Sequence, residues 1–386
     1  MQYRKFGNLD VNVSALGFGA MRLPVKAGCK ALMGPDIDEA EAIAMMRHAM
    51  DCGVNYVDTA YPYHGGNSEV VVGKALQDGY RKKVSLATKM PSWLANDYAD
   101  FDRIFNEQLK RLQTDHIDFY LLHALNRDHW PKVRDLDVLE WAQKRMDIGQ
   151  IGHLGFSFHD NLENFKIIVD GCDLWSFCQI QYNFMDVEYQ TGTVGLQYAA
   201  KKGLAIVIME PLRGGQLAKK PPAVVQEILT ANGITQTLAD LALKWVWNQP
   251  EVSLLLSGMT HMDHVIENVE SAKHSGIGTL LAKELAVVDQ LRDQYRALSP
   301  IPCTNCQYCL PCPNGVDIPH AFGQYNDSTM YADARTARFR YQMKAKETWA
   351  DNCIECKECE EKCPQQIPIV DWLKKAHAWL GPQKRS

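Results

Sequence analysis

Eight short apolar runs, rich in β-branched and aromatic residues, alternate along the chain with segments whose apolar residues recur every three to four positions. The first pattern is typical of buried strands and the second of amphipathic helices. The expected strands are residues 15–23, 55–60, 84–89, 117–123, 152–158, 177–183, 204–210 and 252–258. The expected helices are residues 37–52, 68–79, 97–112, 133–149, 161–169, 190–202 and 235–248, followed by 262–274 and 279–298. Strands that alternate with helices pair in parallel, and eight such units predict closure into a (β/α)₈ TIM barrel.

An open, doubly wound sheet is the alternative that strand counting alone leaves open. A sheet of that kind that binds a dinucleotide usually carries G-x-G-x-x-G after its first strand. Here Gly17-Phe18-Gly19 is followed by Ala-Met-Arg-Leu, with no third glycine. The barrel is therefore favoured, and residues 1–13 are expected to form a short hairpin that turns at Gly7-Asn8 and closes the bottom of the barrel.

Length and proline placement divide the chain into two expected domains. The chain has 386 residues, which is more than one ordinary small domain needs. Pro300 and Pro302 resist continuation of the preceding helix. We therefore expect the barrel over residues 1–298 and a small separate module over residues 299–386, ending in an amphipathic helix near residues 369–380.

Composition argues against two classes of partner. A net charge of −5 disfavours broad nucleic-acid binding, which needs a basic face. No apolar run reaches the roughly 18 residues expected of a membrane-spanning helix. The first residues also lack the uninterrupted apolar stretch of a secretory signal. We expect a cytoplasmic protein with no nucleic-acid and no membrane partner.

Four polar residues stand at or just beyond the ends of successive expected strands. They are Asp58, Tyr63, Lys89 and His123. In a barrel the C-terminal ends of the strands carry the active site. Reduction of a carbonyl needs a proton donor for the developing alkoxide, and a phenol can serve if a neighbouring ammonium lowers its pKa. A carboxylate would hold that ammonium charged, and an imidazole can orient the carbonyl oxygen.

These segments resemble a known family. Asp-Thr-Ala-x-x-Tyr at residues 58–63, Ala-Thr-Lys at 87–89 and Tyr-Leu-Leu-His at 120–123 resemble the catalytic tetrad of the aldo/keto reductases. Further similar segments are Gly155-Phe156-Ser157, Gln179-Ile180-Gln181-Tyr182-Asn183, Glu210-Pro211-Leu212 and Glu267-Asn268. The resemblance covers about residues 1–298.

The resemblance implies a reaction and a cofactor, NADP or NAD. Tyr63 would be the general acid for a small aldehyde, ketone or alcohol substrate, with Lys89 and Asp58 tuning it and His123 positioning the substrate. The residues implied to bind the nucleotide are Ser157 and Gln179 at the nicotinamide carboxamide, Leu212 at the pyrophosphate, and Glu267 and Asn268 at the adenine.

The chain departs from the family pattern at the nucleotide. Gly258 and His264 stand where family members place basic residues for the 2′-phosphate of NADP, and neither is a permanent charge. Met209 replaces the tyrosine that usually stacks on nicotinamide, and Phe158 replaces an asparagine. A preference for NADP is therefore in doubt.

Eight of the twelve cysteines crowd into two runs near the C-terminus. Cys353, Cys356, Cys359 and Cys363, with Pro364, follow the bacterial ferredoxin spacing C-x₂-C-x₂-C-x₃-C-P. The first run, Cys303, Cys306, Cys309 and Cys312, is one residue shorter before its last cysteine. Two [4Fe–4S] clusters in a ferredoxin-like domain are expected, with structural zinc as the alternative.

In a two-cluster ferredoxin the fourth cysteine of each run ligates the other cluster. One cluster is therefore assigned to Cys303, Cys306, Cys309 and Cys363, and the other to Cys312, Cys353, Cys356 and Cys359. The short spacing makes Cys312 the least certain ligand. The other cysteines, Cys29, Cys52, Cys172 and Cys178, are expected to be core or small surface residues.

The function expected from these features is NAD(P)-dependent reduction of a carbonyl. Hydride carries two electrons whereas each cluster takes one, so the clusters are structural, sense redox state or serve an electron-transfer partner protein. A second hypothesis is an electron-transfer or sensor protein whose barrel binds nucleotide with little turnover. A third makes the tail a structural cap. The loop of residues 126–137, with His129 and Trp130, and the residues His64 and His159 are expected to line the substrate mouth.

Overall fold

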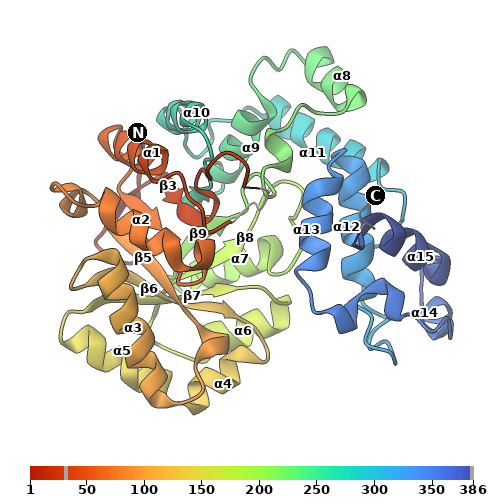
Figure 1. The fold of residues 1–386 in the computed structure, drawn as a ribbon. Helices are drawn as coiled ribbons and strands as arrows, with labels where there is room; N and C mark the ends of the chain where they lie inside the picture. The colour runs from red at the N-terminus through yellow and green to blue at the C-terminus, as the bar shows by residue number, and fades with distance from the viewer. Residues whose placement is uncertain (30–33, 383–386) are drawn as a thin grey trace. The chain divides into compact units, whose positions relative to one another are not determined.

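The computed structural model describes residues 1–29 and 34–382, so the last residues of the expected domain 299–386 lie outside the described part. Within it, a closed barrel has the strand order β10-β3-β4-β5-β6-β7-β8-β9 (Figure 1). The strands are β3 (Leu16–Gly19), β4 (Tyr56–Asp58), β5 (Ser85–Pro91), β6 (Ile117–Leu125), β7 (Ile151–Phe158), β8 (Trp175–Gln181), β9 (Ala205–Met209) and β10 (Val252–Ser257). Parallel pairing of β10 with β3, with Leu255 opposite Leu16, closes the ring. The predicted barrel is confirmed, and the open sheet is excluded.

A small hairpin closes one end of the barrel, as predicted. Strands β1 (Tyr3–Lys5) and β2 (Asn12–Ser14) pair antiparallel, and Phe6 between them is fully buried, 4.5 Å from Phe119 between ring centroids. Gly7 has a φ of 57°, and a Cβ there would lie 2.5 Å from the backbone nitrogen of Ala205. Only glycine fits this approach, and the hairpin leaves the opposite end of the barrel for a site.

Helices surround the barrel in the expected alternation, except that residues 129–147, expected as the end of a loop and one helix, form two helices. The helices of this part are α1 (Glu39–Asp51), α2 (Asn67–Ala75), α3 (Tyr98–Leu112), α4 (His129–Asp135), α5 (Val138–Asp147), α6 (Leu162–Asp170), α7 (Gly192–Lys201), α9 (Leu238–Trp247) and α10 (Met262–Lys273). The expectation of a loop over residues 126–137 is wrong because most of that segment is α4. Its Trp130 is buried against Trp175, with ring centroids 5.7 Å apart, and so belongs to the core.

The chain divides into two compact units. One comprises residues 1–215 and 236–281, and the other comprises residues 216–235 and 282–386. The second unit therefore includes α8 (Ala223–Ala231), which lies between β9 and α9 in the sequence, and α11 (Ala282–Ala297). These two helices contact each other. The sequence-based division at residue 298 places both with the barrel, whereas the compact units group them with the cysteine module.

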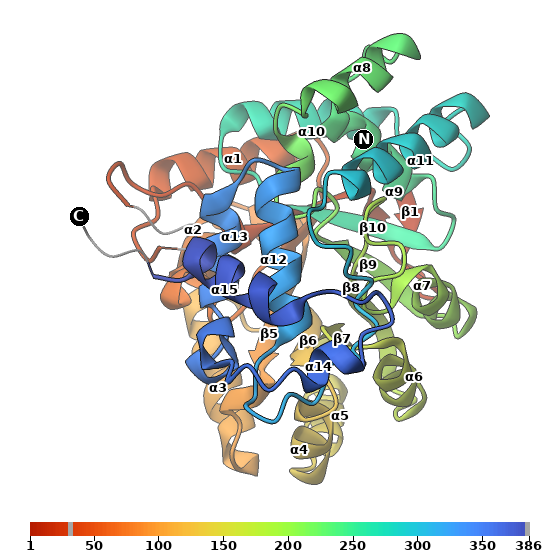
Figure 2. The same ribbon diagram turned by 90° about the vertical axis from the view of Figure 1, so that its right-hand side faces the viewer.

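The cysteine module is built on three helices that contact one another, α12 (Ile318–Met330), α13 (Ala334–Gln342) and α15 (Ile369–Leu380) (Figure 2). Their core includes Phe322, Tyr341, Trp349 and Leu373. Six of the cysteines are partly buried against this core: Cys303, Cys309, Cys312, Cys353, Cys359 and Cys363. A single short helix, α14 (Glu358–Glu361), lies within the second cysteine run. None of the helices in residues 1–29 and 34–382 has the length and apolar character needed to cross a bilayer.

Candidate active site and cysteine module

Two residues of the expected tetrad form a buried ion pair at the open end of the barrel. Lys89 on β5 is fully buried, and its Nζ lies 2.5 Å from Oδ1 of Asp58 at the end of β4. The same Nζ donates to the backbone oxygen of Thr59 at 2.7 Å. Burial alone would lower the pKa of Lys89, but Asp58 and Tyr63 raise it above its ordinary value. The lysine is therefore a fixed positive charge inside the mouth of the barrel.

Tyr63 follows β4 and lies beside this charge. The Lys89 Nζ is 5.0 Å from the centre of the Tyr63 ring. Burial raises the pKa of Tyr63, and the opposing effect of Lys89 is smaller. The sequence led us to expect a lowered pKa; the direction differs because burial disfavours the phenolate more than one neighbouring charge favours it. At neutral pH the phenol therefore keeps its proton.

His123 on β6 faces Tyr63 and a tryptophan. Its ring centroid is 5.9 Å from that of Tyr63 and 5.1 Å from that of Trp93. Burial, followed by the charge of Lys89, holds the pKa of His123 well below its usual range, so the imidazole is neutral at neutral pH. Trp93 was not singled out from the sequence. It lies four residues after Lys89, in the turn η4 (Ser92–Leu94) at the same end of the barrel, and it remains 36% exposed.

Three buried polar atoms in the mouth have no hydrogen-bond partner within the described chain. They are Oδ2 of Asp58, Nδ1 of His123 and Oε1 of Gln179. A buried polar atom without a partner costs about 1–3 kcal/mol, and native proteins contain few of them. Strands β4, β6 and β8 bring these three to the same end of the barrel. The arrangement fits a polar ligand that would supply the missing partners.

The residues expected to bind a nucleotide divide into two groups. Ser157 on β7 and Gln179 on β8 are register partners, so they lie side by side. The Ser157 hydroxyl oxygen accepts from the backbone nitrogen of Ala124 at 2.8 Å. Asn268 in α10 is buried and donates to the Ser257 hydroxyl, 2.9 Å away at the end of β10. The structure thus places Ser157 beside Gln179 and links Asn268 to the end of β10.

The other two expected nucleotide residues lie nearer the surface. Leu212 is partly buried in the segment after β9, and Glu267 is exposed on α10. No hydrogen bond or ion pair orients the carboxylate of Glu267 within the described chain. Their roles remain predictions.

His64 and His159, also expected at the substrate mouth, differ in their exposure. His64 is buried, and both of its ring nitrogens bond to the backbone, Nδ1 to the oxygen of Gly34 at 2.7 Å and Nε2 to the nitrogen of Leu23 at 3.2 Å. It therefore holds two loops together and does not line the mouth as expected. His159 is exposed just beyond β7 and lies near enough to His123 to lower the pKa of that imidazole.

A buried polar network supports the tetrad from outside the barrel. Glu69 on α2 is fully buried and accepts from Thr88 at 2.6 Å and from Gln108 at 2.8 Å. Arg111 of α3 forms an ion pair with it at 3.1 Å. Gln108 also donates to the backbone oxygen of Lys89 at 3.1 Å. This network fixes the strand that carries the lysine, and no sequence motif pointed to it.

The pH dependence of stability provides a test of the environment of His123. Because its pKa is lowered in the folded state, the unfolded chain takes up a proton near pH 6.5 that the folded chain does not. Its contribution to stability is present above that pH and is lost as the pH falls below it. We expect wild type to lose more free energy of unfolding than His123→Gln between pH 7 and pH 5, as measured by urea denaturation. Equal losses would contradict a neutral buried His123.

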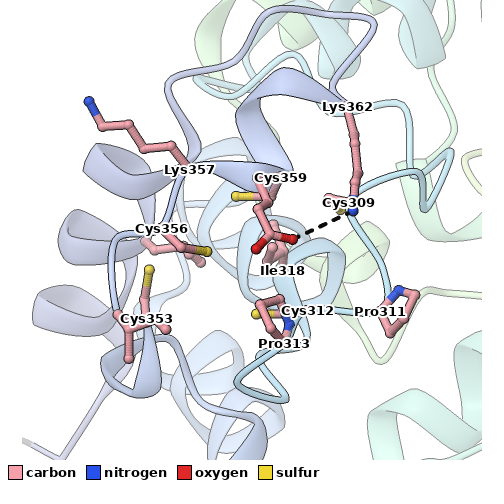
Figure 3. Close-up of a pocket in the computed structure, with 13 residues that line it drawn as sticks. Cys309, Pro311, Cys312, Pro313, Ile318, Cys353, Cys356, Lys357, Cys359 and Lys362 are labelled. Carbon is pink, nitrogen blue, oxygen red and sulfur yellow. Dashed lines mark ion pairs between the residues drawn. The ribbon is translucent and has the colours of Figure 1, made fainter.

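Five cysteines line one pocket: Cys309, Cys312, Cys353, Cys356 and Cys359. Its lining includes Cys312, Cys353, Cys356 and Cys359, and Figure 3 shows their sulfur atoms pointing toward one another. Cys312 comes from the other run, so the short spacing before it does not keep it from the pocket. The pocket thus contains the four residues assigned to one cluster, together with Cys309 of the other assigned set. In the described part of the chain, no three His, Cys, Asp or Glu side chains converge on a point that would hold a single metal ion.

The two cysteine runs share one backbone conformation. The residues on either side of the second cysteine have positive φ in both: Asn305 at 57° and Gln307 at 65°, and Glu355 at 59° and Lys357 at 64°. None is glycine, and such residues cost about 1–3 kcal/mol each when held in a sparsely populated region. The second cysteine of each run therefore stands between two left-handed residues, and the two runs share this local bend.

Cys303 lies near two other cysteines of its assigned set. Burial raises the pKa of Cys303, and the neighbouring Cys306 and Cys363 add to the increase. Burial also raises the pKa of Cys309 to about 12 and that of Cys359 to about 11. Free thiols of this kind stay protonated at neutral pH, whereas a bound metal deprotonates its thiol ligands. The cysteine thiols, and the backbone conformation that the two runs share, fit iron–sulfur clusters.

Comparison with known proteins gives the family. Residues 15–291 match the model of the aldo/keto reductase family, and residues 302–367 match that of the 4Fe-4S dicluster domain. The first match covers more than half of the chain. The chain therefore belongs to the aldo/keto reductase family, and it carries a 4Fe-4S dicluster domain.

Individual relatives agree with this assignment. L-galactose dehydrogenase of Arabidopsis thaliana is 26% identical over 296 residues, covering 70% of this chain and 87% of that protein. Protein tas of Escherichia coli (strain K12) is 26% identical, covering 75% and 98%.

Solved structures give the same family. The holo form of aldo-keto reductase AKR11C1 from Bacillus halodurans has a TM-score of 0.62 at 26% identity, covering 75% of this chain and 96% of that one. An aldo-keto reductase from Klebsiella pneumoniae in complex with NADPH has a TM-score of 0.61 at 25% identity, covering 76% and 95%. The resemblance seen in the sequence is confirmed.

Proposed function

We propose that this chain is an NAD(P)H-dependent oxidoreductase that reduces a small aldehyde or ketone, or oxidises the corresponding alcohol, with Tyr63 as general acid. The observation that carries the proposal is the grouping of Tyr63, the Asp58–Lys89 ion pair and a neutral His123 in one barrel mouth. Family membership supports the reaction class. A complex with NADPH among the structural relatives supports the cofactor.

Each residue of the tetrad has its own proposed role in the reaction. A bound nicotinamide supplies the hydride. Tyr63 donates the proton of its hydroxyl to the carbonyl oxygen as negative charge develops there. The Lys89 ammonium stabilises the phenolate that remains, and Asp58 keeps that ammonium charged and in place. The neutral His123 orients the carbonyl oxygen by a hydrogen bond.

The proposed nucleotide contacts follow the same assignment. Ser157 and Gln179 would hold the nicotinamide carboxamide, and the unpartnered Oε1 of Gln179 suits its amide N–H. Leu212 would face the pyrophosphate, and Glu267 and Asn268 the adenine. Burial lowers the pKa of His264, so this residue offers no fixed charge to a 2′-phosphate. We therefore propose that NADP is not strongly preferred over NAD.

The module would hold two [4Fe–4S] clusters. We assign one cluster to Cys303, Cys306, Cys309 and Cys363 and the other to Cys312, Cys353, Cys356 and Cys359. Cys306 and Cys356 are exposed, one in each set, so both clusters would approach the surface. This exposure favours exchange of single electrons with a partner protein over a purely structural cap. We also propose a cytoplasmic location, because a reducing compartment keeps thiol ligands available for clusters.

The experiment that tests the proposal uses anaerobically purified protein. Binding of NADH and NADPH is measured by quenching of tryptophan fluorescence, and oxidation of each is then followed with a panel of aldehydes and ketones. Turnover with at least one carbonyl is expected. Electron paramagnetic resonance after dithionite, NADH or NADPH asks whether the clusters are reduced. Nucleotide binding without any turnover would favour the sensor function, and no binding would contradict both.

A further inference from the structure

The segment between β9 and α9 joins the two compact units. Residues 210–215 belong to the barrel unit, and residues 216–235 belong to the unit of the cysteine module. The first part contains Leu212, which we place at the cofactor pyrophosphate, so any role of this segment in cofactor binding rests on the proposed function. The loop at the proposed nucleotide site therefore continues, after Gly215, into the cysteine module.

The first part of this segment has an unusual backbone. Glu210 has a φ of 58° and Arg213 of 50°, followed by Gly214 at 67° and Gly215 at 87°. Two of these four are not glycine, and such residues keep a left-handed conformation only when their surroundings hold them there.

Side chains of the barrel unit hold one end of the segment. Asn183 donates to the backbone oxygen of Glu210 at 3.0 Å, and Arg22 donates to that of Gly214 at 3.1 Å. Arg213 pairs with the buried Asp186 at 3.1 Å. Three side chains of the barrel unit therefore hold residues 210–214.

A single carboxylate of the cysteine module holds the other end. Oδ2 of Asp333 accepts from the buried Gln216 at 2.8 Å and also from Lys219. Its other oxygen, Oδ1, caps α13 by accepting from the backbone nitrogen of Thr336 at 3.1 Å. Asp333 is 8% exposed. Burial alone would raise the pKa of Asp333, but the bonds from Lys219 and Thr336 hold it well below its usual range.

We propose that Asp333 is a positioning residue for the cofactor: it anchors the loop after β9 to the cysteine module, so that affinity for the nicotinamide nucleotide depends on that module. Only Gly214 and Gly215 separate the anchor at Arg213 from the anchor at Gln216. The three residue steps from Arg213 to Gln216 span at most about 11 Å, so release of the anchor at Gln216 would give residues 213–215 freedom that the anchored segment lacks. The module would thus influence the barrel mechanically, without any transfer of electrons between cluster and nicotinamide.

Asp333→Asn removes the bonds that anchor the loop but keeps the cap of α13. Asparagine caps a helix as well as aspartate does, but its amide nitrogen cannot accept the bonds from Gln216 and Lys219. We expect the dissociation constants of NADH and NADPH to rise about tenfold, as for loss of a hydrogen bond to a charged group. The kcat at saturating nucleotide is expected to stay within about twofold, because no group that touches the substrate changes. Lys219→Met, which removes the partner instead, is expected to act in the same direction.

Asp317→Asn is the matched control. Asp317 caps α12 in the same module, accepting from His320 at 3.2 Å, and it pairs with Lys344 at 3.4 Å. The chemical change is the same, but this residue does not touch the segment 210–219. Nucleotide affinity of Asp317→Asn is expected to equal that of wild type, with the same iron content in all variants.

A readout that needs no nucleotide separates this inference from the proposed function. Hydrogen–deuterium exchange of residues 210–219 in the nucleotide-free holoprotein is expected to be faster in Asp333→Asn and Lys219→Met than in Asp317→Asn. Unchanged exchange together with unchanged nucleotide affinity overturns the inference and leaves the proposed function standing. Faster exchange in a chain whose wild type binds no nucleotide overturns the proposed function, and with it the role of Asp333 in binding.

Discussion

Tyr63→Phe is expected to lower kcat for carbonyl reduction by about three orders of magnitude, in the middle of the range for loss of a general acid. The substitution removes only the hydroxyl, so the aromatic contacts with His123 and Lys89 can remain. Nucleotide affinity should match that of wild type because Tyr63 is not one of the proposed nucleotide contacts. The spectra of the clusters should also be unchanged because Tyr63 is not a cluster ligand. The measurement is steady-state oxidation of NADPH with the best carbonyl substrate.

Tyr61→Phe provides the control. Tyr61 lies two residues away, and its hydroxyl donates to Glu107 at 2.8 Å. The same atom is removed, but no proton for the reaction is lost, so kcat should stay within about threefold of wild type, as for loss of one ordinary hydrogen bond. If Tyr63→Phe retained a tenth or more of the activity, another group would have to be the proton donor.

The barrel could be predicted from sequence because the same strand–helix pattern recurs eight times along the chain. Each expected strand is a continuous apolar run, as buried parallel strands require, and the structure contains all eight. The hairpin at Gly7 could be predicted for a local reason, since its turn chemistry lies within a few residues. Asp58, Lys89 and His123 could be proposed as neighbours because the C-terminal ends of parallel strands meet at one end of a barrel. The observed pair at 2.5 Å agrees with that reasoning.

Properties that depend on tertiary surroundings could not be predicted. The raised pKa of Tyr63 results from burial, which the local sequence does not record. Trp93 is an ordinary loop aromatic until the fold brings it 5.1 Å from His123. Trp130 was expected in the mouth, but its burial follows from packing on Trp175. The anchor at Asp333 joins residues 114 or more positions apart, and no periodicity reports such a distance.

In the cysteine runs, some ligands could be predicted from the sequence and others could not. The C-x₂-C-x₂-C spacing predicts that three thiols of each run bind the same cluster. It does not predict the fourth ligand, which comes from a distant part of the chain. For one set, the pocket that Cys312 lines with Cys353, Cys356 and Cys359, and also with Cys309, supports Cys312 as the proposed fourth ligand. The left-handed residues such as Gln307 and Lys357 carry no sequence mark, because neither is glycine or asparagine.

Cys312→Ser is expected to remove one of two clusters. Iron prefers thiolate ligands in such clusters, and a serine hydroxyl is a poor substitute. Iron content should fall from about eight to about four atoms per chain, and the spin count of the dithionite-reduced protein should fall by about half. Cys172→Ser is the control: this thiol accepts from the backbone nitrogen of Leu174 at 3.3 Å, outside the module, and its replacement should leave iron content unchanged.

The size of the loss identifies the role of Cys312. Loss of about four iron atoms means that the second run cannot hold a cluster with three thiolates, so the crossed ligand is required. Loss of about one atom would mean that three thiolates retain a three-iron cluster, and no loss would mean that Cys312 is not a ligand. Because a crossed ligand ties residues 312 and 353–359 through the cluster, its removal should also lower the denaturant midpoint of the module. Cys172→Ser should not change that midpoint, so a shift confined to Cys312→Ser would show that the cluster also holds the two cysteine runs together.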